Sequence, residues 1–89
     1  MNYHVVLLPP AQKDLDAFRG KLLAKFGTLI LALSNNPRPR HCRKLSGGGS
    51  NWRLRSGVYR ILYEIDEKTK TVRVYRIAHR KDVYRALHR

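Results

Sequence analysis

The residues in this chain that are best suited to chemistry are arginines, which gather beyond residue 37. Positions 38 to 60 hold seven Lys and Arg side chains and no Asp or Glu: Arg38, Arg40, Arg43, Lys44, Arg53, Arg55 and Arg60. A second basic group surrounds a single acid, Asp82, and contains Arg73, Arg76, Arg80, Lys81 and Arg85. A guanidinium group matches the geometry of phosphate better than an ammonium group does. These clusters therefore indicate a ligand that carries phosphate.

The charge of the whole chain points in the same direction. Its 89 residues include 19 Lys and Arg against 6 Asp and Glu, a formal net charge of +13. Such a charge exceeds what solubility needs and favours a polyanionic partner, such as RNA, DNA or an acidic protein. The hydrophobic content of 43% is that of a globular chain rather than a disordered tail. The length predicts one small domain over residues 1–89.

The usual catalytic and metal-binding motifs are missing from the sequence. It has no Gly-x-Ser-x-Gly, and Gly47-Gly48-Gly49 is not followed by the Lys-Ser/Thr of a phosphate-binding loop. The six acids are scattered, which argues against a two-metal nuclease, and the four histidines lack the spacing of metal ligands. Cys42 is the only cysteine, so neither an internal disulfide nor a cysteine zinc site is expected. We therefore expect no metal and no cofactor.

RNA supplies chemistry that an arginine-rich site can use. Its 2′-OH can attack the adjacent phosphate, so the protein needs only to position the strand, stabilise the pentavalent phosphate and move protons. Arginines can stabilise the charge, and a Lys, His or Tyr in a strongly positive field can take part in proton transfer. The composition fits a metal-free ribonuclease and a passive RNA-binding protein equally well.

Aromatic side chains lie among the arginines and are candidates for stacking on unpaired bases. Tyr59 and Tyr63 alternate with polar positions and share a face with Ile61 and Ile65, which predicts that both tyrosines belong to the core. Tyr84 lies outside a clear apolar period, close to the end of the chain, and is the better candidate for function.

The apolar periods predict the elements that must position these residues. Residues 3–8 are expected to form a strand that Pro9 and Pro10 end. Apolar residues then recur every three or four positions, and Gly20 interrupts them, which predicts a helical hairpin over residues 10–19 and 21–34. After a glycine-rich turn at 47–50, alternation predicts an antiparallel meander of strands 52–55, 58–65 and 71–79, followed by a short helix over 82–87. The fold class is α+β.

Two segments of the C-terminal half are distinctive: Trp52 to Ile65, WRLRSGVYRILYEI, and Tyr75 to Arg85, YRIAHRKDVYR. In these segments, and in the order of strand, helical hairpin and meander, the chain resembles the RelE/ParE superfamily of bacterial and archaeal type II toxins. The resemblance implies a RelE-like fold and the activity of a RelE-type mRNA interferase. Such a toxin enters the ribosomal A site and cleaves the mRNA there by attack of a 2′-OH.

The resemblance also implies catalytic residues. Arg53 matches the basic residue that acts near the 2′-OH as a candidate general base, and Arg60 matches the arginine that stabilises the phosphate. Arg80 matches the residue assigned to leaving-group protonation or phosphate contact, and Tyr84 matches the tyrosine that stacks on or orients the base.

Arg53 departs from what a general base requires, because a guanidinium group scarcely loses its proton. Either Arg53 binds phosphate alone, or the activity is weak. His79, next to Arg80, is the natural substitute, since histidine titrates nearest neutral pH; a local structural role for His79 is an equal alternative. Four further side chains are expected to contact RNA phosphates or the ribosome: Arg43, Lys44, Arg55 and Lys81.

The resemblance implies partners as well: mRNA and the ribosome, and a cognate acidic antitoxin that wraps the toxin and holds it inactive in a complex. The longest apolar run, Leu29 to Leu33, is too short to span a bilayer, and no signal peptide is recognised, so we expect a cytoplasmic protein without a membrane partner. Two alternatives stay open. One is a ParE-like toxin that inhibits DNA gyrase by binding and cuts nothing, and the other is an inactive binding module.

Overall fold

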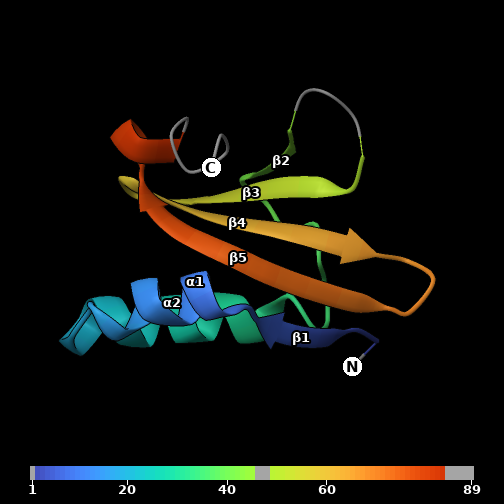
Figure 1. Ribbon diagram of the computed structural model, residues 1–89, viewed down its shortest axis with the longest axis horizontal. Helices are drawn as coiled ribbons and strands as arrows, with labels where there is room; N and C mark the ends of the chain where they lie inside the picture. The colour runs from blue at the N-terminus through green and yellow to red at the C-terminus, as the bar shows by residue number, and fades with distance from the viewer. Residues whose placement is uncertain (1, 46–48, 84–89) are drawn as a thin grey trace.

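Two helices cover one face of a five-stranded sheet in the computed structural model, which describes residues 2–45 and 49–83 (Figure 1). The elements in chain order are β1 (His4–Leu7), α1 (Pro9–Asp16), α2 (Gly20–Ala32), β2 (Cys42–Lys44), β3 (Asn51–Ser56), β4 (Tyr59–Asp66), β5 (Thr71–His79) and the 3-10 turn η1 (Arg80–Asp82). The α+β prediction of a strand, a helical hairpin and an antiparallel meander is confirmed. Of the helix predicted over 82–87, only residues 82 and 83 lie within the described part, and Asp82 belongs to η1.

The strands lie side by side in the order β1-β5-β4-β3-β2. The strands β3, β4 and β5 form the predicted meander, and β1 joins one edge by running parallel to β5, with His4 opposite Thr71 and Leu7 opposite Val74. The sequence analysis did not predict β2, which pairs with β3 at the other edge. Its residues, Cys42 to Lys44, are too few and too polar to show alternation, so this strand exists because β3 offers it a partner.

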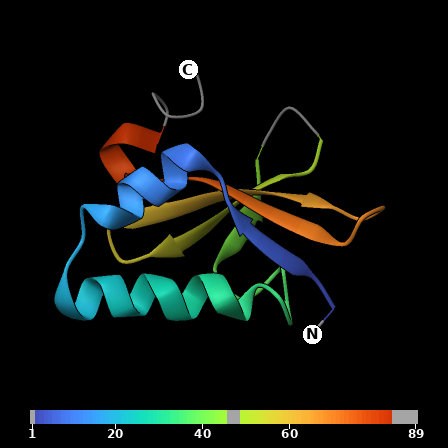
Figure 2. The ribbon, with the colours of Figure 1, turned by 60° about the horizontal axis from the view of Figure 1, so that its bottom comes forward.

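Prolines and a glycine determine where the two helices begin. Pro9 and Pro10 occupy the first turn of α1, one residue earlier than the predicted start. Proline fits there because the N–H groups of a first turn have no partner within the helix. Gly20 has a φ of 61°, which favours glycine, and it makes the sharp turn from which α2 starts (Figure 2). The second helix ends at Ala32 rather than at Ser34.

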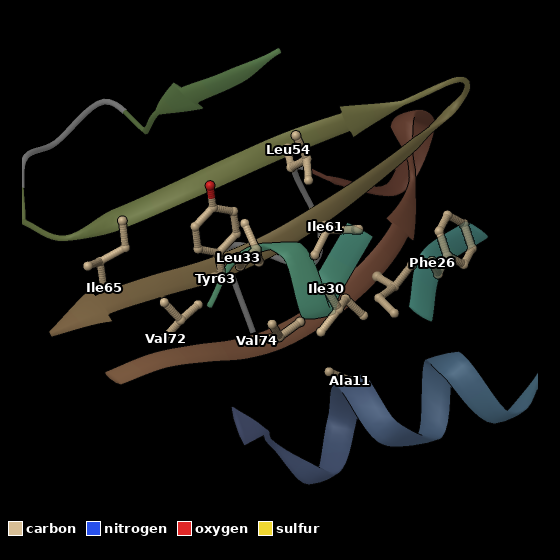
Figure 3. Packing of buried hydrophobic residues seen from close by; sticks show 11 residues of the cluster. Ala11, Phe26, Ile30, Leu33, Leu54, Ile61, Tyr63, Ile65, Val72 and Val74 are labelled. Atoms are coloured by element: carbon tan, nitrogen blue, oxygen red, sulfur yellow. The ribbon is translucent and has the colours of Figure 1, made fainter. Parts of the chain in front are cut away.

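The hydrophobic core lies between the helices and the sheet (Figure 3). Phe26 and Ile30 of α2, and Leu33 directly after it, pack there against Ala11 of α1 and against side chains of β3, β4 and β5: Leu54, Ile61, Tyr63, Ile65, Val72, Val74 and Ile77. Tyr63 is fully buried, as predicted, and its hydroxyl donates to the carbonyl of Pro37 at 2.7 Å. Burial raises the pKa of Tyr63, so this hydroxyl stays protonated. Tyr59 is half-buried against the same cluster, which confirms its predicted place.

A smaller apolar cluster occupies the opposite face of the sheet. Leu62 and Ala78 are buried there beneath Val83, which follows η1. The turn η1 therefore folds over this face, on the side of the sheet away from the helices (Figure 1). The backbone N–H of Arg80 donates to the carbonyl of Val58 at 2.7 Å, which fixes the start of η1 beside the turn between β3 and β4.

An ion pair joins α1 to the end of β5 at the point where β1 stops. The Asp14 carboxylate accepts two hydrogen bonds from the Arg76 guanidinium, at 2.7 and 3.2 Å, and a third from the backbone N–H of Ile77 at 2.8 Å. The last bond replaces a strand partner, because β1 pairs with β5 only as far as Val74. Both side chains of the pair are mostly buried, with 18% of Asp14 and 27% of Arg76 exposed.

A second polar cluster ties the connector between α2 and β2 to the turn between β4 and β5. Glu67 accepts hydrogen bonds from the Arg38 guanidinium, from the Tyr3 hydroxyl at 2.8 Å and from the Lys70 ammonium at 3.2 Å. The bond from Arg38 contributes most, and together the three bonds lower the pKa of Glu67 to about 2. The Arg38 guanidinium also lies over the ring of Trp52, 5.2 Å from its centroid.

Glu67 is expected to stabilise the fold in a pH-dependent way. A pKa lowered by folding contributes stability that is present above the ordinary value of 4.5 and is lost as the pH falls toward 2. The melting temperature of Glu67→Gln should therefore be lower than that of the natural protein at pH 7, and the two values should converge between pH 4.5 and pH 2. Lys68→Gln is the control, since Lys68 acts in the same turn through its backbone N–H. A difference that is independent of pH would contradict the expectation.

Candidate functional site

Strand register brings the arginines of the first basic group together. Arg53 and Arg55 alternate with Leu54, which packs into the core, so the two arginine side chains leave β3 on the other face. Arg43 of β2 lies opposite Arg53, and Arg60 of β4 lies opposite Arg55. Because paired residues point to the same face, these four arginines form one basic surface.

Two cavities of about 520 and 510 Å³ open among these side chains. The first is lined by His41, Cys42, Arg43, Arg53, Arg55 and Arg60. The second reaches α2 and η1 and is lined by Lys25, Leu29, His41, Arg55, Ser56, Gly57, Arg60 and Arg80. They share His41, Arg55 and Arg60, and we call the two together the arginine cleft. Among the described residues that line it there is no Asp or Glu.

Arg60 lies at the centre of the arginine cleft. Its Nη1 donates to the carbonyls of Gly57 at 3.1 Å and Tyr59 at 2.9 Å, so the half-buried guanidinium is held in one place. Burial lowers the pKa of Arg60. Three neighbouring positive charges lower the same pKa further: Arg53, Arg55 and Arg80. Arginine keeps its proton at any working pH, so this crowding of charge favours an anion in the cleft.

Ser56 adds a polar group that lacks a partner. Its side chain is 7% exposed, its hydroxyl has no hydrogen-bond partner within the described part of the chain, and the residue borders the second cavity. A buried hydroxyl is normally hydrogen-bonded. Ser56 lies on the same face of β3 as the core residue Leu54, so its hydroxyl does not face the phosphate site between the arginines.

In the sequence, the second basic group looks like a single phosphate-binding surface. The structure shows that it is not one. Arg73 is paired with Glu64 and with Asp66, both at 3.3 Å, and Arg76 is paired with Asp14. These contacts join residues that are 7 to 62 positions apart in the sequence, so the pairing is not apparent from the local run of charges. Arg80 is the member of this group that lines the arginine cleft.

The structure places the other predicted site residues outside the arginine cleft or does not describe them. Lys44 of β2 lies opposite Trp52 of β3. It is the next residue after Arg43 in the strand, so its side chain points to the other face of the sheet. Lys81 is exposed on η1 and does not line either cavity within the described part of the chain. Tyr84, like Arg85, lies outside the described residues.

His79 is the last residue of β5, caps the start of η1 and makes local contacts. Its Nδ1 accepts a hydrogen bond from the backbone N–H of Lys81 at 3.1 Å, and its ring packs edge-on against Tyr59, with 5.6 Å between the ring centroids. These contacts correspond to the local structural role that the sequence analysis weighs against proton transfer. Among the described residues, those lining the arginine cleft do not include His79.

His41 is the cleft residue that the sequence analysis does not single out. It lines both cavities, and its Nδ1 lies 3.4 Å from Nη2 of Arg55. The four histidines lack the spacing of metal ligands, but His41 lies within the acid-free run of basic residues at 38 to 60, which is the signal in the sequence that points to it. Within the described residues, 2–45 and 49–83, no group of three or more His, Cys, Asp or Glu side chains is placed to hold a metal ion.

Comparison with known proteins identifies the family. Residues 5–84 match the family model of the ParE toxin of the type II toxin-antitoxin system parDE. The chain belongs to this toxin family. Toxin RelG of Mycobacterium tuberculosis is 36% identical over 90 residues, which cover 96% of this chain and 99% of RelG. The resemblance to the RelE/ParE superfamily is thus confirmed, and the protein is a type II toxin of this superfamily.

Solved toxin structures share the fold of this RelE/ParE toxin. The toxin-antitoxin complex RelBE2 of Mycobacterium tuberculosis contains a chain that is 30% identical, with a TM-score of 0.77, covering 89% of this chain and 99% of that one. The archaeal RelE-RelB complex of Pyrococcus horikoshii contains a chain that is 27% identical, with a TM-score of 0.80, covering 90% of this chain and 97% of that one. In the described part of this toxin, neither helix is long and apolar enough to cross a membrane.

Proposed function

We propose that this RelE/ParE toxin is a ribosome-dependent endoribonuclease that acts in the cytoplasm and cleaves mRNA in the A site. The observation that carries the proposal is the acid-free arginine cleft, in which Arg53, Arg55 and Arg80 surround the fixed guanidinium of Arg60. Such a cleft suits a phosphate whose negative charge increases in the transition state.

In the proposed reaction the substrate provides the nucleophile. The 2′-OH attacks the adjacent phosphate, and the two carbonyls that hold Arg60 place its guanidinium before the reaction begins. Arg53 and Arg80 bind the oxygens of the pentavalent phosphate from either side, and Arg43 and Arg55 hold the flanking backbone. Tyr84 is proposed, from the family resemblance alone, to stack on or orient a base, and Lys44 and Lys81 to add ribosomal contacts outside the cleft.

The proposed regulator is a cognate acidic antitoxin. The similar chains come from the toxin-antitoxin complex RelBE2 of Mycobacterium tuberculosis and from the RelE-RelB complex of Pyrococcus horikoshii. A free surface of charge +13 attracts an acidic chain, and α2 exposes 36% of Leu23 and 72% of Leu31. An acidic, partly disordered antitoxin that binds both features would neutralise the toxin.

Primer extension on a reporter mRNA in a reconstituted translation system tests the activity. We expect cuts inside codons that appear only when ribosomes are present and whose yield falls as salt is raised, since phosphate binding by arginine releases counterions. Cuts in naked RNA would support the nuclease activity and contradict its dependence on the ribosome. An absence of cuts in both conditions would overturn the proposed activity.

A ParE-like action on DNA gyrase is the second candidate, because the family model that matches residues 5–84 is that of a ParE toxin. Such a toxin would bind gyrase and leave mRNA intact. Supercoiling by purified gyrase in the presence of the toxin distinguishes the two. Inhibition of gyrase together with intact mRNA would support the ParE-like action, and unimpaired supercoiling together with ribosome-dependent cuts would support the RelE-like one.

A further inference from the structure

The proposed cleavage requires a group that takes the proton of the 2′-OH, and the arginines of the cleft cannot do so. We propose that His41 is this proton acceptor. The inference rests on the proposed function. Histidine suits the task because its charge changes near neutral pH, and His41 lines both cavities of the arginine cleft.

His41 directly precedes the first residue of β2. Its φ of 70° is unusual for a residue other than glycine, and its carbonyl accepts a hydrogen bond from the backbone N–H of Arg55 at 3.1 Å. This bond extends the pairing of β2 with β3 by one step, so the position of the imidazole is set by the same two strands that carry Arg43, Arg53 and Arg55. The side chain is exposed to the cleft.

The contact between Arg55 and His41 shows where the imidazole can accept a proton. A guanidinium group only donates, so Nδ1 of His41 accepts in this 3.4 Å contact when the imidazole carries its hydrogen on Nε2. In that tautomer the electron pair on Nδ1 faces a group that would itself bind phosphate. When the Arg55 guanidinium binds phosphate oxygens, it no longer contacts Nδ1 of His41. Nδ1 is then free to accept a proton beside the bound phosphate.

The step balances without a further reagent. The 2′-oxygen forms a bond to phosphorus as its proton passes to Nδ1 of His41, and the bond from phosphorus to the 5′-oxygen breaks. The leaving oxygen takes a proton from water, and His41 returns its own proton to water. The products are a 2′,3′-cyclic phosphate and a free 5′-hydroxyl.

Other groups of the cleft and of η1 are less suited to this step. Among the described residues, those that line the two cavities include His41 and do not include His79. The charged groups that share the two cavities with His41 are all cationic: Arg43, Arg53, Arg55 and Arg60 from the strands, Lys25 from α2 and Arg80 from η1. Guanidinium and ammonium groups donate hydrogen bonds and do not accept them, so none of these groups can take the proton of the 2′-OH.

Single-turnover cleavage of ribosome-bound mRNA by His41→Asn tests the inference. Asparagine tolerates a positive φ and cannot take a proton, so the fold should be kept. We expect the cleavage rate to fall about 100-fold while binding to the ribosome changes little, and the rise in rate between about pH 5 and about pH 8 to disappear. His4→Asn is the matched control, because His4 is an exposed histidine on β1, at the other edge of the sheet.

The outcomes separate this inference from the proposed function. Full activity of His41→Asn, or a pH profile like that of the natural protein, would overturn the role of His41 and leave the nuclease intact. A parallel loss of binding and cleavage would also overturn it, since His41 would then only hold the substrate. An absence of cleavage by the natural protein would instead overturn the proposed function. If His41→Asn melts below the assay temperature, His41→Gly, which also suits the positive φ, replaces it.

Discussion

Replacing Arg60 with alanine is expected to lower the rate of mRNA cleavage about 1000-fold, because it removes the donor that is best placed to stabilise the pentavalent phosphate. Arg60 is half-buried, lines both cavities and is held by the carbonyls of Gly57 and Tyr59. The loss should appear in the rate of the chemical step, measured in single turnovers on ribosome-bound mRNA. Arg60→Lys should recover only part of it, since an ammonium group lacks the planar fork.

The matched control is Arg73→Ala, which removes the same charge outside the cleft. Arg73 of β5 is engaged by Glu64 and Asp66 of β4, so its loss should leave the cleavage rate within a few-fold of the natural value. Melting temperatures of both variants separate a catalytic loss from a folding loss, since Arg60 also bonds the turn between β3 and β4. Equal losses in the two variants would mean that total charge matters and the cleft does not.

Replacing Asp14 with alanine is expected to reduce the free energy of unfolding by about 2 kcal/mol, since it leaves a half-buried charge and a backbone donor without partners. The Arg76 guanidinium, 27% exposed, and the backbone N–H of Ile77 both donate to this carboxylate. Urea unfolding measures the change, and the slope of the transition should stay the same. The Asp14 carboxylate thus fastens α1 to β5 beyond the end of β1.

Asp16→Ala is the control for this prediction. Asp16 lies in the same helix, is exposed and accepts a side-chain hydrogen bond only from Gln12 among the described residues. Its replacement should change the free energy of unfolding by no more than about 0.5 kcal/mol. In the double variant Asp14→Ala with Arg76→Met, part of the lost stability should return, because no unpaired charge is then buried. A double variant as unstable as Asp14→Ala would show that the unpaired charge is not the cause.

The sequence by itself determined the order of the elements and the chemistry that the chain carries. Alternation in Arg53-Leu54-Arg55 and from Tyr59 to Ile65 identified β3 and β4, because the side chains of a strand change face at every residue. The spacing of the apolar residues around Phe26 identified α2 in the same local way. The acid-free run of arginines predicted a polyanionic partner, and the motifs of the C-terminal half, with the order of the elements, carried the resemblance to the family that the comparisons confirm.

Only the tertiary structure decided which charges are free and which side chains meet. Arg73 and Arg76 look like further phosphate ligands in the sequence and are engaged by acids from other elements. His41 looks like an isolated histidine and shares a cleft with Arg60, because β2 pairs with β3. The physical reason is the distance along the chain between the residues that interact. Periodicity is a property of neighbouring residues, whereas ion pairs and strand register depend on distances in space between segments that the chain order leaves undetermined.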